Sequence, residues 1–293
     1  MAQSAAAPDE LDVAAVREAM ARRARARARG PQLQAVRELR IDGLPARLYR
    51  PVSGRAPLVV YLHGGGWTMG SLASHDRICR RLADGSGAAV LAIDYRLAPE
   101  HPWPASVDDT VAALRWVASA PAELGQAPTA VAVAGDSAGG TLAALACLRL
   151  RAEYPAALPG LQVLLYANTD LTGAQPSMRE KAEGWGLTVA RVRFFNSQWV
   201  PDQARWSDPG VSPLFAPDLS GLPGALIVTA ENDPLRDESE AYASRLRDAG
   251  VEVELRREPG LIHNFMMLDE ISPACAAAGD RVAADLRARL NGL

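Results

Sequence analysis

The sequence predicts an α/β fold built around a mostly parallel sheet with helices on both faces. Short apolar runs rich in Val, Leu and Ile alternate with longer segments of helical character along most of the chain. Continuous apolar runs are typical of strands that are buried on both faces. A chain of 293 residues, 48% of them hydrophobic and 22% charged, is large enough to bury such a core.

The first expected elements precede the parallel part of the sheet. Residues 9–29 have an acidic start, an Ala-rich body and late basic residues, which predict a helix that a Gly-Pro pair ends. Two alternating stretches follow, 36–41 and 46–51, and the Asp-Gly pair between them is a hairpin signal. We therefore expect antiparallel strands at one edge of the sheet.

Apolar runs and helical segments then alternate. The expected strands are 57–63, 88–95, 130–135, 161–167, 225–230 and 251–256. The expected helices lie near 75–84, 106–119, 138–153, 237–249 and 274–290. This alternation is typical of βαβ units, which place strands in parallel. Together with the hairpin, the runs predict an eight-stranded sheet.

One interval, 168–222, contains no clean strand but is rich in aromatic residues. A long insertion of this kind is commonly a lid or a functional loop. The start of the chain likewise belongs to no crossover. We expect residues 1–40 and a segment at about 175–210 to form a small helical cap on a main domain of residues 41–293. The cap would cover the carboxyl edge of the sheet, where open α/β sheets bind ligands.

Composition argues against nucleic-acid and membrane partners. The formal net charge is −3, and the arginines of 21–30 are scattered around a helix axis, which favours a solvated helix end over a binding arm. No apolar run could span a bilayer or serve as a signal-peptide core, so we expect a cytoplasmic protein without membrane insertion. Cys79, Cys147 and Cys275 are far apart and predict reduced thiols rather than disulfides or a zinc site.

The candidate nucleophile is Ser137, within the pattern G-x-S-x-G at residues 135–139. The pattern alone is weak, and a Gly/Ala-rich turn is the simpler interpretation. An expected strand runs directly into it, however, and an expected helix leaves it, which is the context of a nucleophile held on a sharp turn. Gly135 and Gly139 suit such a strained turn because they have no Cβ. Ser137 would also lie at the positive end of the helix.

A serine nucleophile needs a base, and the candidate is His263. Among the four histidines it alone lies in the loop after the last expected strand, where a base for this turn has to come from. His63, before three glycines, is interpreted as a loop residue, and His75 as the start of a helix. His101 lies in a Pro-rich stretch and is interpreted as structural.

The candidate acid that orients this base is Asp233, which follows the expected strand 225–230. Asp237 is interpreted as a first-turn charge of the next helix. Asp170, after the preceding strand, is the runner-up. The chain order Ser, Asp, His is the one expected for a nucleophile on this kind of strand-to-helix turn.

The stretch HGGGW at 63–67 is a candidate oxyanion hole. Acyl transfer creates an oxyanion, and its stabilisation needs backbone N–H groups aimed at one point. Glycines after a strand let the main chain approach closely. The expected donors are the amides of Gly65, Gly66 and Ala138, with Gly64 as a substitute.

These motifs resemble those of the hormone-sensitive-lipase-like carboxylesterases, a bacterial esterase and lipase family of the α/β-hydrolase superfamily. The matching stretches are HGGGW (63–67), DYRLAPEHPWPA (94–105), GDSAGG (135–140) and DPLRDE (233–238), in the family's order. The resemblance spans roughly residues 40–270. It implies the α/β-hydrolase fold with a helical cap, and it implies that the candidate serine, acid and base form a triad. It further implies that the oxyanion loop is braced by Tyr95, Arg96 and Glu100.

The motifs and the resemblance together predict a serine carboxylesterase that needs no metal or organic cofactor. It would hydrolyse short- to medium-chain acyl esters through an acyl-enzyme intermediate. Asn264, after the candidate base, departs from the family pattern, where a small residue such as Gly is usual. The aromatic-rich cap suggests an apolar substrate pocket. Its candidate lining residues are Trp67, Asp136, Trp185, Phe194 and Trp199.

Other activities stay open at this point. The same fold can serve as a non-catalytic small-molecule receptor, and the same triad can cleave lactones or amides. A dinucleotide site is excluded, because the stretch 85–90 lacks the third Gly of G-x-G-x-x-G and precedes a strand. The expected partner is a small ester. A homodimer through the exposed edge strand 251–256 is a further expectation, because unpaired edges invite pairing.

Overall fold

The computed structural model describes residues 12–293. The strands form one eight-stranded sheet in the order β1-β2-β4-β3-β5-β6-β7-β8. The pairs β1–β2 and β2–β4 are antiparallel, and the other pairs are parallel. The predicted fold class and the predicted edge hairpin are thus confirmed. The strands are β1 (Ala35–Ile41), β2 (Leu44–Arg50), β3 (Leu58–Leu62), β4 (Ala89–Ile93), β5 (Val131–Asp136), β6 (Leu161–Leu165), β7 (Gly224–Asn232) and β8 (Val253–Ile262).

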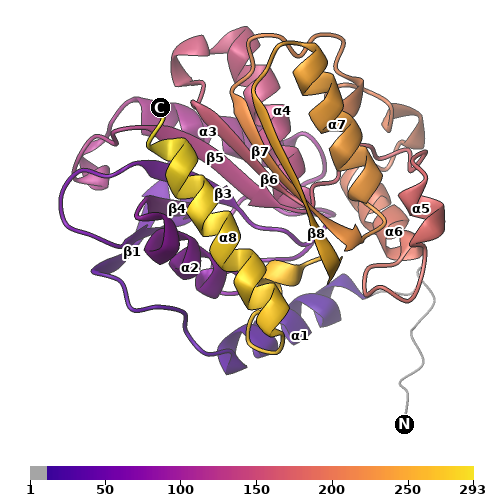
Figure 1. The fold of residues 1–293 in the computed structure, drawn as a ribbon, viewed down its shortest axis with the longest axis horizontal. Coiled ribbons are helices and arrows are strands. Elements are labelled where there is room, and N and C mark those ends of the chain that lie inside the picture. The colour runs from indigo at the N-terminus through magenta and orange to yellow at the C-terminus, as the bar shows by residue number, and fades with distance from the viewer. Residues whose placement is uncertain (1–11) are drawn as a thin grey trace.

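Helices cover both faces of the sheet (Figure 1). Two of them, α2 and α8, pack on one face, and α3, α4 and α7 pack on the other. Their bounds are α2 (Asp76–Ser86), α3 (Ala105–Ala118), α4 (Ala138–Glu153), α7 (Arg236–Asp248) and α8 (Pro273–Leu290).

The strand β3 shows why the apolar runs are continuous. Leu58, Val60 and Leu62 contribute to the core beneath α3 and α4. Val59 and Tyr61 contribute to the core beneath α2 and α8. Successive side chains of a strand point to opposite faces, so a strand with a core on each side needs apolar residues throughout.

The register of the central strands brings distant motifs together. Leu62 at the end of β3 pairs with Gly135 of β5, so the segments that follow the two strands emerge side by side. At the far edge, β8 extends to Ile262, well beyond the predicted end at residue 256, because it continues along the long strand β7 through an irregularity near Ala230. The extension delivers His263 to the carboxyl edge of the sheet.

The predicted strandless interval contains α5 (Ser177–Glu180) and α6 (Val189–Trp199). The first helix, α1 (Val13–Ala26), is shorter than the predicted 9–29, of which residues 9–11 lie outside the described part. Asp12 caps α1 by accepting hydrogen bonds from the amides of Ala14 and Ala15. Figure 1 shows α1 lying beyond the carboxyl ends of β7 and β8.

Two arginines attach α1 to loops that are distant in sequence. Arg17 donates to the carbonyl oxygens of Thr68 and Ala98 at 2.7 and 2.8 Å. Arg27 pairs with Asp269 at 2.9 Å, and this carboxylate is almost fully buried. The arginines near Arg27 in sequence are solvent-exposed, as expected for a solvated helix end; they are Arg22, Arg23, Arg25 and Arg29. Within residues 12–293, no helix is both long enough and apolar enough to cross a membrane.

Candidate active site

Ser137 lies on a strained turn between β5 and α4. Its φ and ψ angles are 54° and −122°, a region that non-glycine residues rarely occupy. A Cβ on Gly135 would lie 2.3 Å from the backbone of Gly139, and a Cβ on Gly139 would lie 1.9 Å from the Leu62 carbonyl oxygen. The chain can therefore turn this sharply only with glycine at both positions, as the sequence predicted.

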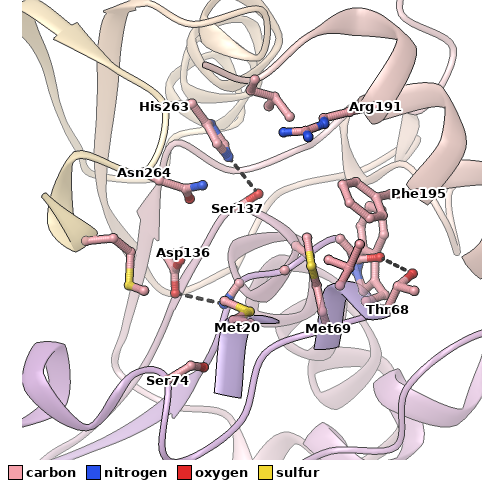
Figure 2. A pocket seen from close by; sticks show the side chains of 18 of the residues that line it. Met20, Thr68, Met69, Ser74, Asp136, Ser137, Arg191, Phe195, His263 and Asn264 are labelled. Atoms are coloured by element: carbon pink, nitrogen blue, oxygen red, sulfur yellow. Dashed lines mark hydrogen bonds between the residues drawn. The ribbon is translucent and has the colours of Figure 1, made fainter. Parts of the chain in front are cut away.

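The three candidate triad side chains form a continuous hydrogen-bonded line. His263 Nε2 lies 3.0 Å from Ser137 Oγ, and His263 Nδ1 lies 2.7 Å from Asp233 Oδ2 (Figure 2 shows the serine–histidine contact). Asp233 is fully buried, and its other oxygen accepts from the Leu235 amide at 2.9 Å. With Nδ1–H donating to the carboxylate, Nε2 is left free to accept the serine proton.

The two alternative carboxylates, those of Asp170 and Asp237, do not contact His263. Asp170 accepts from the amide and the hydroxyl of Thr172. It also faces Glu238, whose pKa is raised well above its usual value by burial and by the charge of Asp170. Asp237 lies in the first turn of α7 and accepts from the Ser177 amide at 2.8 Å. Only Asp233 among the three contacts His263.

None of the other three histidines forms a hydrogen bond with Ser137. His63 is buried, stacks on Tyr95 with ring centroids 4.3 Å apart, and has its Nδ1 2.9 Å from the Gly64 carbonyl oxygen. Burial and the neighbouring His75 lower the pKa of His63 to about 3, so this ring is neutral. His75 is the N-cap residue of α2, and His101 is exposed.

The Gly-rich loop presents free amides beside the nucleophile. Within the described residues, the amides of Gly65, Gly66 and Ala138 donate to no protein acceptor. The Gly64 amide, the predicted substitute, already donates to Asp136 Oδ1 at 2.9 Å. The φ angles of Gly65 and Gly66 are 122° and 59°, which glycine adopts readily. Three donors are thus available for an oxyanion.

Asp136 holds this loop in place. The Tyr61 hydroxyl donates to its Oδ1 at 2.7 Å, and His75 Nε2 lies 3.4 Å from its Oδ2. Burial alone would raise the pKa of Asp136, but the charge and hydrogen bond of His75 and the hydrogen bond from Tyr61 lower it below its usual value. The carboxylate therefore stays ionised and anchors the Gly64 amide. The sequence offered one hint of this role, an acidic residue at the buried end of a strand.

The segment 94–105 braces the same loop from outside. The Tyr95 hydroxyl donates to the His63 carbonyl oxygen at 2.7 Å. Glu100 acts indirectly, because it pairs at 2.7 Å with Arg17, which in turn reaches the loop. Arg96 instead binds Asp109 and makes no contact with the loop among its hydrogen bonds.

A cavity of about 600 Å³ opens at Ser137. Of the predicted pocket residues, Trp67, Asp136 and Phe194 line it. Trp185 and Trp199 lie elsewhere. Trp199 is fully buried, because it stacks on Trp67 with centroids 4.1 Å apart and donates to Ser106 Oγ. The Trp185 ring lies under Lys181 and is 37% exposed.

The cavity lining comes from both ends of the chain. α1 contributes Val16 and Met20, and α6 contributes Val192 and Phe195. Sequence patterns did not single out these residues, since amphipathic helices present apolar residues to any neighbour. Asn264 also lines the cavity with φ 62°, a left-handed conformation that Asn tolerates better than most residues. This conformation accounts for an Asn where the family usually has Gly.

Known proteins share this arrangement. Residues 59–267 match a protein family described by its α/β hydrolase fold. Carboxylic ester hydrolase LipN of Mycobacterium tuberculosis is 46% identical over 89% of this chain and 73% of its own length. Ethyl acetate hydrolase of Pseudomonas putida is 40% identical over 78% of this chain and 73% of its own length.

A solved structure agrees over nearly the whole chain. The Pyrobaculum calidifontis esterase superimposes with a TM-score of 0.91 and 40% identity, covering 98% of this chain and 95% of that one. The matches span the strand-to-helix turn, the Gly-rich loop and the loop that carries His263. The chain therefore belongs to the α/β-hydrolase fold family, among the hormone-sensitive-lipase-like carboxylic ester hydrolases.

Proposed function

We propose that this carboxylic ester hydrolase works through Ser137 as nucleophile, His263 as general base and acid, and Asp233 as the group that orients the histidine. The observation that carries the proposal is the hydrogen-bonded line of these three side chains, which ends on a strained turn beside free backbone amides. Each part has a separate chemical task in acyl transfer.

The reaction proceeds in two halves. His263 Nε2 takes the proton of Ser137 Oγ as the oxygen attacks the ester carbonyl, and the free amides of the loop stabilise the oxyanion. His263 then protonates the leaving alcohol, which gives an acyl-enzyme. Water, deprotonated by the same nitrogen, releases the acid. Asp233 holds the productive tautomer and stabilises the imidazolium in both halves.

The proposed cap consists of α1 and the segment around α5 and α6. Its support is the cavity, which α1 and α6 line with apolar side chains. A volume of about 600 Å³ is within the range of small-molecule sites and suits short- to medium-chain acyl esters. The similarity to an ethyl acetate hydrolase also favours short esters. Residues 35–40 belong to β1, so the N-terminal part of the cap ends before them.

We further propose that the protein is a cytoplasmic homodimer. β8 lies at the edge of the sheet and pairs within residues 12–293 only with β7, which leaves a long row of backbone groups for a partner strand. The three cysteines are free and buried, which suits a reducing compartment. Light scattering across a range of concentrations tests the dimer, and a monomer at every concentration would contradict it.

Hydrolysis of p-nitrophenyl butyrate tests the catalytic proposal. We expect a fast wild type and a Ser137→Ala variant slower by about a millionfold, because the nucleophile and its base act as a unit. Circular dichroism of both proteins checks that they are folded. Equal, slow rates would contradict the proposal and favour a small-molecule receptor.

A further inference from the structure

The cavity beside Ser137 is apolar, yet two arginines without an acidic partner line it. Arg191 comes from α6 and Arg23 from α1. Both are solvent-exposed although they contribute to the lining, and neither forms an ion pair within residues 12–293. A third lining arginine, Arg27, forms ion pairs with Asp269 and Glu270. Figure 2 shows the guanidinium of Arg191 reaching from its helix toward the side of the cavity where His263 and Ser137 lie.

No acidic side chain in the lining of this cavity is free to balance these two charges. Asp136 is the single carboxylate in the lining, and it is 1% exposed and committed to Tyr61, Gly64 and His75. Asp233 is fully buried against His263. The lining therefore includes two exposed positive charges that no acidic side chain of the lining offsets.

These charges do not help a neutral ester. His263 becomes positive as Ser137 attacks, and a guanidinium facing it opposes this development by like-charge repulsion. An anion bound to the arginine would remove the repulsion and would gain a charge-assisted, bidentate hydrogen bond. The cation is useful to catalysis when the substrate itself brings a negative charge.

We propose that the cavity selects esters whose apolar chain ends in a carboxylate, such as half-esters of dicarboxylic acids, with Arg191 as the principal binding cation and Arg23 as the second. Leu187, Val192 and Phe195 lie along the same lining and suit the methylenes between the two ends. This inference rests on the proposed function, since Ser137 must cleave the ester.

The reaction remains a simple hydrolysis. The bond between the acyl carbon and the ester oxygen breaks, and the alcohol leaves with the proton that His263 carries. Water supplies the hydroxyl that the acyl carbon gains. The new carboxylic acid gives its proton to solvent, so the products are a dicarboxylate and an alcohol.

Matched substrates isolate the effect of the terminal charge. Monoethyl adipate and ethyl hexanoate have acyl chains of equal length and differ in a terminal carboxylate or methyl group. The measured quantity is the ratio of their kcat/KM values, from ethanol release. Arg191→Gln and Arg23→Gln are compared with Arg193→Gln, which removes an equal charge from the same helix at a position outside the lining of this cavity.

We expect Arg191→Gln to lower the adipate-to-hexanoate ratio by about tenfold, mainly through KM, which is the order expected for one charge-assisted hydrogen bond. Arg23→Gln should lower the ratio less, and Arg193→Gln should leave it unchanged. Added salt should lower the wild-type ratio by screening. An unchanged ratio in Arg191→Gln, or an equal fall in Arg193→Gln, would overturn the inference. If the wild type still hydrolysed ethyl hexanoate, the proposed function would stand. Failure of the wild type on both esters would overturn the two together.

Discussion

Two Ser–His–Asp arrangements meet at the peptide between residues 136 and 137, and they differ in what the serine can do. Both are buried and both include a His ring nitrogen near a carboxylate and a hydroxyl. One consists of Ser137, His263 and Asp233, and the other of Ser74, His75 and Asp136.

The hydroxyl of Ser74 is already engaged by local structure. Its Oγ accepts from the Ser71 amide at 2.9 Å and lies 3.0 Å from the Ser71 carbonyl oxygen, besides its 2.8 Å contact with His75. The hydroxyl of Ser137 has His263 as its hydrogen-bonding partner among the described residues and opens into the cavity. Residue types alone therefore do not make a nucleophile. A strained turn, a free hydroxyl and nearby unpaired amides do.

The two arrangements should differ most in how much kcat falls when the aspartate of each is replaced. Asp233→Asn should lower kcat by about ten-thousandfold, because the imidazole would take the unproductive tautomer. Asp136→Asn should lower kcat by about a hundredfold or less, because it weakens the anchor of the loop that we propose supplies oxyanion donors. Kinetics on p-nitrophenyl butyrate with folded variants measure both, and equal losses would break the distinction between the two arrangements.

The turn at Ser137 can be tested through its glycines. Gly139→Ala places a Cβ 1.9 Å from the Leu62 carbonyl oxygen and should destabilise the fold by about 3 kcal/mol or more. Gly292→Ala meets its nearest atom at 3.5 Å and serves as the matched control. Chemical denaturation compares the two free energies of unfolding. A Gly139→Ala protein as stable as the control would show that the turn is not tightly constrained.

The sequence predicted what local patterns encode. The strand-to-helix turn, the Gly-rich loop and the order of Ser137, Asp233 and His263 were all visible because each is a short motif in a recognisable context. The contact of Asp136 with Tyr61 joins residues 75 positions apart, and no local pattern reports it. The same holds for Arg17, which reaches Thr68 across 51 positions.

Aromatic content was a poorer guide to the pocket. Trp199 was predicted to line the cavity but fills the core beside Trp67, because a large ring gains most from full burial. The end of β8 was also missed, since its pairing with β7 continues after the apolar alternation stops. Both differences reflect tertiary packing that overrides local composition.

The neutral His63 should make stability depend on pH. Its pKa is about 3 in the folded protein against 6.5 in the unfolded chain, so between these values only the unfolded chain binds the proton. Unfolding free energy should fall with falling pH in this window, by at most about 1.4 kcal/mol per pH unit. His63→Asn has no such titrating group. The amount by which its free energy of unfolding falls below that of the wild type should therefore be smaller at pH 4.5 than at pH 7. A constant deficit in urea titrations would contradict the assignment of a neutral ring.

The smallest expected effect concerns the tyrosine that supports Asp136. Tyr61→Phe should lower kcat severalfold and cost about 1 kcal/mol of stability, because one donor to the carboxylate is lost. Tyr49→Phe removes a similar hydrogen bond, to Asp76, away from the Gly-rich loop. The control should lose similar stability and keep its kcat. An equal loss of kcat in both variants would show a general effect of destabilisation instead.

Covalent labelling tests the central claim most directly. The wild type and the Ser74→Ala variant are treated with diethyl p-nitrophenyl phosphate, and the modified residue is found by peptide mass mapping. Ser137, unlike Ser74, has a free hydroxyl beside the proposed base and the unpaired loop amides. We therefore predict one diethylphosphoryl group on Ser137 in both proteins, with loss of esterase activity in step. Labelling at Ser74, or full inactivation without a label on Ser137, would contradict the account.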